Sequence, residues 1–245
     1  MKKMALLGLF IASLSLTAQS TKLQYNLKKG DNYQIDISLK QDMAPIMKMD
    51  IGMSMTMKTT GNSGNSIDSE YRFTQMKMDM SAQGERVQFD SSKKDSELSA
   101  EEKKMKAELA PFLEAVVYQT IDKTGKIVSM KMVPELQGAG AMLGQNQFTN
   151  MVYPKEPVKV GSSWDYKQSL SGMNAKMKYT VTKITGSKVY ADISGAMDGA
   201  ADAKVSGKLI IDKASGMMSS MNMDMTMNAM GSSVGMNITM TSKKI

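Results

Sequence analysis

Methionine is the residue type in this sequence with the most unusual chemical potential. The 245-residue chain contains 28 methionines but no cysteine and no histidine. A thioether is a flexible apolar group and also a soft ligand for Cu(I) or Ag(I). The lack of Cys and His excludes catalysis by a Cys nucleophile or a His base, and zinc sites built on those ligands. No spacing of Ser, Lys or carboxylates indicates another catalytic centre. We therefore predict no catalytic residues, no cofactor, no metal site of the usual ligands and no enzymatic activity.

Many of these methionines alternate with polar residues. Between Met47 and Lys58 every odd position is apolar and every even position is Lys, Asp, Gly, Ser or Thr. A period of two predicts a half-buried antiparallel strand with its apolar side chains turned inward. The same alternation returns at 173–181, 189–193 and 221–227. Turn-forming segments separate these stretches, and the whole chain predicts roughly twelve or thirteen strands.

One strand changes the parity of its apolar positions. Tyr71 and Phe73 are at odd positions, whereas the apolar residues from Met76 onward are at even positions. An extra residue in one strand of an antiparallel pair produces such a change. We therefore predict a β-bulge near Thr74 and Gln75.

Two motifs occur twice and in the same order. Leu27–Tyr33 matches Val158–Trp164, each with a Gly turn followed by an aromatic residue that opens a strand. Ile121–Gly125 matches Ile211–Gly216, each an Asp-containing hairpin loop that ends in Gly. The repetition predicts a duplicated structural unit. In these turns Gly supplies a positive φ, and the aromatic residues at the ends of the first pair anchor the core of each repeat.

The duplication predicts the domain organisation. A first β repeat covers 19–133, a connector covers 134–156 with one short helix from Glu135 to Leu143, and a second β repeat covers 157–245. We predict a mainly β fold with one or more curved antiparallel sheets, or a half-barrel, built from two duplicated halves with one inserted amphipathic helix.

The inserted helix is predicted near 99–110. Ser99 followed three residues later by Glu102 forms a capping box, which is typical of a helix start. An apolar stripe continues from Met105, and Pro111 predicts that the regular helix ends near Ala110. The second repeat has no equivalent segment.

The N-terminus has the pattern of a secretory signal peptide. Lys2 and Lys3 precede an apolar stretch, Ala5–Leu16, which is too short to span a bilayer. Small and polar residues follow, so we predict a signal peptide over 1–18 with cleavage after Ala18. The chain is then exported to the periplasm or cell surface of a gram-negative envelope. Without a cysteine it carries no lipid anchor, and no later segment is apolar enough to be transmembrane.

The distribution of charged residues indicates which classes of partner the protein can bind. The formal net charge is +7, and it comes mainly from lysines that alternate with Asp, Ser and Thr. This pattern predicts a solvent-exposed sheet face. Because nucleic-acid sites rely on Arg clusters and aromatic stacking, which are missing here, we predict no nucleic-acid partner.

Three interpretations of the methionine-rich face remain open. The face binds a lipid or another apolar small molecule, because flexible thioethers adapt to varied shapes. Alternatively, it is the core of a structural or assembly protein with an envelope protein partner. The third interpretation is a Cu(I)- or Ag(I)-binding periplasmic protein. The predicted ligand-lining residues are Met49, Met53, Met55, Met76, Met78, Met223, Met225 and Met227.

Three segments resemble an uncharacterised family of secreted bacterial proteins, the domain-of-unknown-function family 6263. They are Lys28–Tyr33, Ile121–Val128 and Pro154–Trp164, and the resemblance extends over nearly all of the chain after the predicted leader. It implies a duplicated β architecture in the envelope, with no activity or catalytic residues to carry over. A looser likeness, at the level of fold, is to periplasmic half-barrels that carry lipids or lipoproteins. Those proteins wrap a curved antiparallel sheet around a helix.

Overall fold

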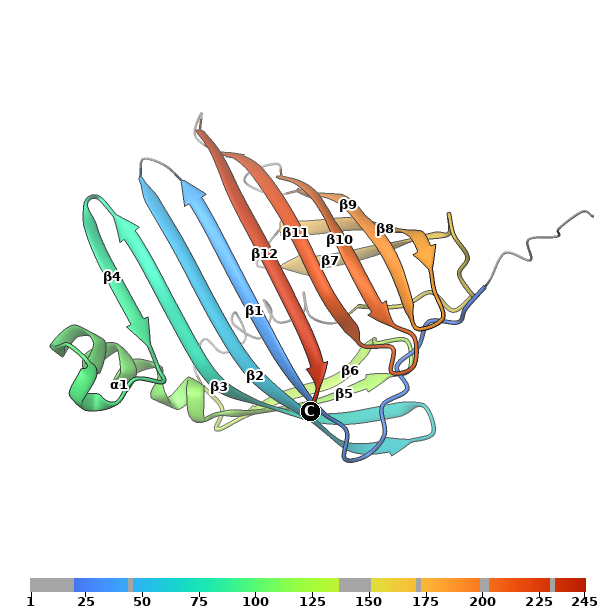
Figure 1. Cartoon of the computed structure of the whole chain (residues 1–245), viewed down its shortest axis with the longest axis horizontal. Helices are drawn as coiled ribbons and strands as arrows, with labels where there is room; N and C mark the ends of the chain where they lie inside the picture. The colour runs from blue at the N-terminus through green and yellow to red at the C-terminus, as the bar shows by residue number, and fades with distance from the viewer. Residues whose placement is uncertain (1–19, 44–45, 137–150, 171–172, 199–202, 230–231) are drawn as a thin grey trace, which may run out of the picture.

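One antiparallel sheet of twelve strands forms almost the entire protein (Figure 1). The computed structural model describes residues 20–43, 46–136, 151–170, 173–198, 203–229 and 232–245. The strands are β1 (Asn32–Met43), β2 (Met47–Ser63), β3 (Ser66–Ala82), β4 (Glu85–Asp90), β5 (Val116–Asp122), β6 (Ile127–Val133), β7 (Ser163–Leu170), β8 (Met173–Ile184), β9 (Lys188–Asp198), β10 (Ala203–Asp212), β11 (Met218–Ala229) and β12 (Ser232–Lys244). A short 3-10 helix, η1 (Asp95–Glu97), and the helix α1 (Ala100–Glu114) lie between β4 and β5.

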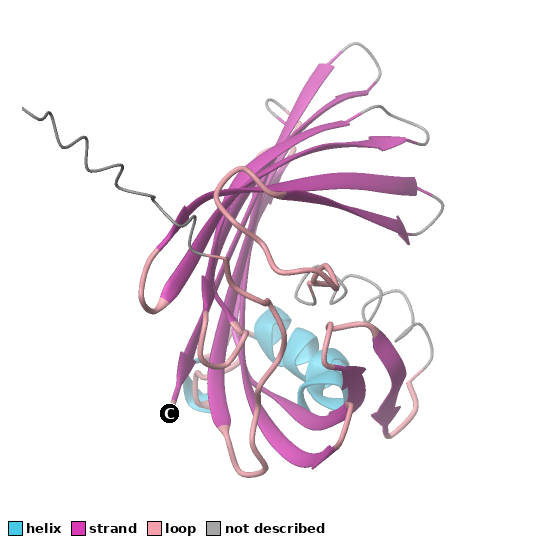
Figure 2. Cartoon of the chain, turned by 90° about the vertical axis from the view of Figure 1, so that its right-hand side faces the viewer, coloured by secondary structure: helices cyan, strands magenta, loops and turns pink. Residues whose placement is uncertain are grey.

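The first and last strands pair at the centre of the sheet. The strand order is β6-β5-β3-β2-β1-β12-β11-β10-β9-β8-β7, and β4 pairs with β3 outside this path. The pairing of β1 with β12 places Tyr33 opposite Lys244 and Ile37 opposite Met240. The sheet is strongly curved, and loops and α1 lie on its inner side (Figure 2). The prediction of a mainly β fold with a curved antiparallel sheet and one inserted helix is confirmed.

The predicted β-bulge is present. Ser54 on β2 pairs with Gln75 on β3, and the next residue, Met55, pairs with Phe73, so Thr74 has no partner in the register. The extra residue returns both Phe73 and Met76 to the inner side of the sheet, where both are buried. The bulge therefore keeps the apolar residues on both sides of Thr74 on the inner face of β3.

The Gly turns of the first repeated motif have the same structure in both halves. Gly30 and Gly161 have φ values of 92° and 87°. The Gly30 amide donates to the Thr59 carbonyl, and the Gly161 amide donates to the Val181 carbonyl, each at 2.8 Å. Both aromatic residues that follow are buried, Tyr33 at 4% and Trp164 at 9% exposure. Each turn is thus hydrogen-bonded to a strand of its own half, the first turn to β2 and the second to β8. The exact repeat boundaries stay a prediction.

The second repeated motif also forms matching turns. Gly125 and Gly216 adopt φ values of 94° and 72°, and their amides donate to the carbonyls of Asp122 and Asp212, each at 2.9 Å. In both turns the aspartate side chain accepts hydrogen bonds from a hydroxyl residue inside the loop. A side chain at Gly216 would collide with the Gln24 carbonyl. Only glycine satisfies both the positive φ and this close approach.

Two crossing segments, residues 21–27 and 151–158, cover part of the inner face. The Tyr25 amide donates a hydrogen bond to the Lys123 carbonyl at 2.9 Å. The Tyr153 amide donates to the Thr124 carbonyl, and the Tyr153 hydroxyl donates to the Gly216 carbonyl at 2.6 Å. The Tyr25 and Tyr153 rings lie 5.2 Å apart. These contacts connect the two matching turns to each other and place both crossing segments in the core.

The inserted helix begins as predicted and ends later. Ser99 Oγ accepts from the Glu102 amide at 3.1 Å, and Glu102 accepts from the Ser99 amide at 2.8 Å, which confirms the capping box. The predicted end near Ala110 is wrong, because α1 continues through Pro111 to Glu114. Proline's fixed φ is compatible with a helix and removes only one hydrogen bond near the C-terminus. The last turn is held by Phe112, whose ring lies 4.3 Å from that of Phe73.

Two sequence-based predictions fall outside the described residues: the signal peptide, and most of the short helix predicted from Glu135 to Leu143. Within the described part of the chain, no helix has both the length and the hydropathy needed to cross a membrane.

A buried hydroxyl distinguishes the two halves and gives a stability test. Thr59 is fully buried, and its Oγ1 has no hydrogen-bond partner. In the second half the matching position is Val181. Its carbonyl accepts from the Gly161 amide and its amide donates to the Ser162 carbonyl, just as Thr59 bonds Gly30 and Asp31. Because an unpaired buried hydroxyl costs about 1–3 kcal/mol, Thr59→Val should raise the free energy of unfolding by about 1 kcal/mol. Equilibrium urea unfolding measures this change. The reciprocal Val181→Thr variant should be less stable than wild type, and a stabilising effect there would contradict the equivalence.

Candidate functional site: the methionine-lined inner face

Methionines from β2, β3, β11 and β12 share the inner face of the sheet. Residues directly opposite each other in an antiparallel pair point to the same side. The register therefore aligns rows of apolar side chains across the strands. One such row runs, from β3 to β11, through Met78, Ile51, Leu39, Ile238 and Met223.

Exposure divides the eight predicted lining residues into two groups. Four are buried, at 2–5% exposure: Met55, Met76, Met223 and Met225. Four are half-buried: Met49, Met53, Met78 and Met227. Met227 lies apart from the other three, because β1 and β12 separate its strand, β11, from β2 and β3. Met49, Met53 and Met78 are close together on β2 and β3.

The structure adds residues that the prediction missed. Around Met49, Met53 and Met78, further half-buried apolar side chains form one surface that surrounds the polar, uncharged side chain of Gln41, and we call these apolar residues the open methionine patch. It consists of Ile37, Leu39, Met43, Met47, Met49, Ile51, Met53, Met78, Met80 and Met236. The added residues have the same alternation in the sequence, so the pattern that identified Met49 also included them. Which of them stay accessible depends on what covers the face.

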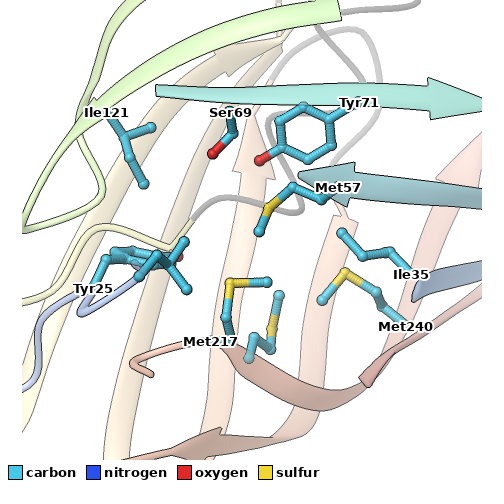
Figure 3. Close-up of a pocket in the computed structure, with 10 residues that line it drawn as sticks. Tyr25, Ile35, Met57, Ser69, Tyr71, Ile121, Met217 and Met240 are labelled. Atoms are coloured by element: carbon cyan, nitrogen blue, oxygen red, sulfur yellow. The ribbon is translucent and has the colours of Figure 1, made fainter. Parts of the chain in front are cut away.

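The other end of the inner face is closed. Here the core surrounds a cavity of only about 20 Å³, toward which Met57, Met217 and Met240 point (Figure 3). A space of this size holds about one water molecule. Methionine is ordinary core at this end, as the second interpretation predicts. The cavity wall includes Tyr25, whose pKa is raised to about 12 by burial, so the phenol stays neutral.

The outer face of the same strands is polar and charged. Lys40 pairs with Asp50 at 3.4 Å across β1 and β2. Arg86 on β4 donates to Asp79 on β3 at 2.6 Å, which lowers the pKa of that carboxyl to about 2. Exposed pairs of this kind contribute little stability. Their main effect is on orientation, because turning the methionines outward would bury these charges.

A second hollow is polar. A groove of about 450 Å³ lies where the first and second motifs approach each other, beside Tyr33 and Lys28. Lys244 and Asp31 in this groove form an ion pair at 2.6 Å. Because these charged groups bind each other, the groove is the weaker candidate for a ligand. Within the described residues, no group of three His, Cys, Asp or Glu side chains could hold a metal ion.

Comparison with known proteins supports the fold and a family resemblance. Residues 130–243 match the Family of unknown function (DUF6263). This range includes the Pro154–Trp164 motif and stops short of the motifs at 28–33 and 121–128. The resemblance to that family is thus confirmed over the second part of the chain. No curated protein matches this sequence.

Among solved structures, the chain is similar to one described as "Lipid-protein interactions in lipovitellin". The TM-score is 0.55 at 9% identity, and the match covers 88% of this chain and 25% of that one. This chain therefore spans about a quarter of the lipovitellin chain. At such low identity the match shows a shared fold of the sheet, which agrees with the looser likeness to lipid-carrying half-barrels.

The two ends of the inner face should respond differently to a charge. Met223→Lys places an unpaired ammonium at a site with 2% exposure, which should cost several kcal/mol and prevent cooperative folding. Met49→Lys lies at the half-buried end, where a lysine can extend its ammonium into water. That variant should fold and lose at most about 1.5 kcal/mol. Circular dichroism during thermal unfolding measures both effects, and equal destabilisation would mean that the patch is also closed.

Proposed function

We propose that this protein is an exported, non-catalytic binding protein that holds an acyl chain or a similar apolar ligand on the open methionine patch. The observation that carries the proposal is the contrast within one face. One end is packed around a cavity of about 20 Å³, whereas the patch at the other end stays half-buried on four neighbouring strands, β3, β2, β1 and β12. A large apolar patch that the described residues leave partly exposed is typical of a binding site.

The residue types fit a ligand of variable shape. Methionine is unbranched, polarisable and easily rearranged, so a methionine-lined surface adapts to different apolar partners. Leu39 and Ile51, directly opposite each other on β1 and β2, give the centre of the patch a stiffer base. The patch presents no charged side chain on its own face. These features favour an uncharged hydrocarbon segment as the bound part of the ligand.

The fold likeness adds modest support. The matched lipovitellin structure is described by its lipid–protein interactions, so a sheet of similar fold is found in a protein that interacts with lipid. Because one fold can host many functions, the likeness alone does not identify a ligand. The argument for a lipid-like ligand therefore rests on the open methionine patch.

The alternative function, a structural or assembly protein with a methionine-filled core, is favoured by one observation. Met55, Met57, Met76, Met223 and Met240 are all at most 5% exposed. These residues act as core under either function. The two functions differ in what they predict for the open methionine patch, which an assembly protein would cover with another protein.

Titration with a fluorescent long-chain fatty acid tests the ligand. The wild-type protein should bind it saturably, and the double variant Met49→Gln/Met78→Gln should bind at least about tenfold more weakly, because two polar amides interrupt the apolar surface. The matched control is Lys48→Gln/Lys77→Gln, which changes exposed residues on the outer face of the same strands and should bind like wild type. Absence of saturable binding, or equal affinity in both double variants, would contradict the proposal.

Export is tested by the mass of the protein in cell fractions. Expressed from its full gene in a gram-negative host, the protein should appear in the periplasmic or extracellular fraction with Gln19 as its first residue, because the pattern of Lys2, Lys3 and Ala5–Leu16 is that of a cleaved leader. A cytoplasmic protein of full mass would show that this part of the proposal is wrong.

A further inference from the structure

Four methionines gather at the tip of the open methionine patch. Met43 on β1 is directly opposite Met47 on β2, and Met49 on β2 is directly opposite Met80 on β3. Met47 and Met49 are two residues apart on one strand and so share its inner face. All four side chains are half-buried, which leaves them accessible from solvent. We call Met43, Met47, Met49 and Met80 the thioether cluster.

The backbone places these side chains within reach of one point. Directly opposed residues of an antiparallel pair have Cβ atoms about 4.5–5.5 Å apart, and neighbours two residues apart on a strand are about 6.6–6.8 Å apart. Each methionine side chain has three rotatable bonds and no branch, so its sulfur can move over several positions. The sulfurs of Met43, Met47 and Met49, or those of Met47, Met49 and Met80, can therefore approach a common centre without any change in the strands.

We propose that the thioether cluster binds a monovalent soft metal ion, Cu(I) or Ag(I). Thioether sulfur is a neutral, soft ligand that prefers such ions to Mg²⁺, Ca²⁺ or Zn²⁺. The whole sequence contains no histidine and no cysteine, so it lacks the ligands that recruit the commoner transition metals. Neutral thioether ligands also leave the charge of the ion uncompensated, which disfavours a divalent ion more than a monovalent one.

A neighbouring amide contributes to the arrangement of the cluster. Gln41 is directly opposite Met49 on the same face, and its Nε2 donates to Met43 Sδ at 3.2 Å. This hydrogen bond restrains the Met43 side chain at the end of β1. Groups that orient a ligand in this way commonly change metal affinity by about 10–100-fold. Gln41 is therefore a positioning residue for the site.

A buried methionine pair provides a comparison within the same face. Met221 on β11 is directly opposite Met240 on β12, with exposures of 5% and 3%. These two residues are directly opposite each other, as Met43 and Met47 are, but both are buried, and Met221 is also opposite Leu209 on β10. Alternation and register alone therefore do not produce a metal site. The thioether cluster differs from the buried pair because several of its sulfurs are accessible to an ion from solvent.

The experiment uses leucine variants, because leucine keeps the volume and apolar character of methionine and removes only the sulfur. Met43→Leu/Met49→Leu changes the thioether cluster, and Met221→Leu/Met240→Leu changes the buried pair. Each full-length protein is titrated anaerobically with Cu(I) against a chromophoric Cu(I) chelator. Circular dichroism confirms that each variant is folded.

Wild type and the buried-pair variant should each bind one Cu(I), and the cluster variant should bind at least about tenfold more weakly. X-ray absorption of the Cu(I) complex should show sulfur ligands. No competition with the chelator by wild type, or equal affinity in both variants, would overturn the proposal. Fatty-acid binding by wild type and by the buried-pair variant, neither of which changes the open methionine patch, serves as a separate readout. Saturable fatty-acid binding by wild type without Cu(I) binding would overturn the metal site alone, so failure of the metal site and failure of the acyl site are distinguishable.

Discussion

The alternation of side chains along antiparallel strands is the constraint on which the rest of this structure depends. Methionines and aliphatic residues face inward, and the paired charges of residues such as Lys40 and Asp50 face outward. A shift of one residue would bury those charges and expose the apolar side. On β3 the apolar residues change from odd to even positions, and the bulge at Thr74 keeps both sets on the inner face. The result is one apolar face that continues across β3, β2, β1, β12 and β11.

The proposed function depends on the part of this face that the described segments leave incompletely covered. The crossing segments 21–27 and 151–158 join the two matching hairpin turns and fill one end of the curve. Helix α1 packs near the bulge through Phe112. β2 and β3 are each 17 residues long and extend beyond this packing. Their far ends keep the same inward methionines but have less packed against them. The same sequence pattern thus serves as core at one end and as surface at the other.

Local features of the fold could be predicted from the sequence, because each depends on a few neighbouring residues. The bulge follows from the parity of Phe73 and Met76, and the start of α1 follows from Ser99 and Glu102. The end of α1 could not be predicted from Pro111, since packing of the following residue decides it. The accessible methionines could not be separated either: Met49 and Met223 both alternate with polar neighbours. Their difference in burial comes from segments distant in the sequence.

The central claim is that the open methionine patch is an accessible surface that an apolar ligand covers. Limited oxidation by hydrogen peroxide, followed by peptide mass spectrometry, measures this directly for individual methionines. Because sulfoxide formation follows exposure, Met49, Met53 and Met78 should oxidise at least about tenfold faster than the buried Met57 and Met223. A long-chain fatty acid should slow oxidation of the first group alone. Equal rates in both groups, or rates that the fatty acid leaves unchanged, would contradict the account.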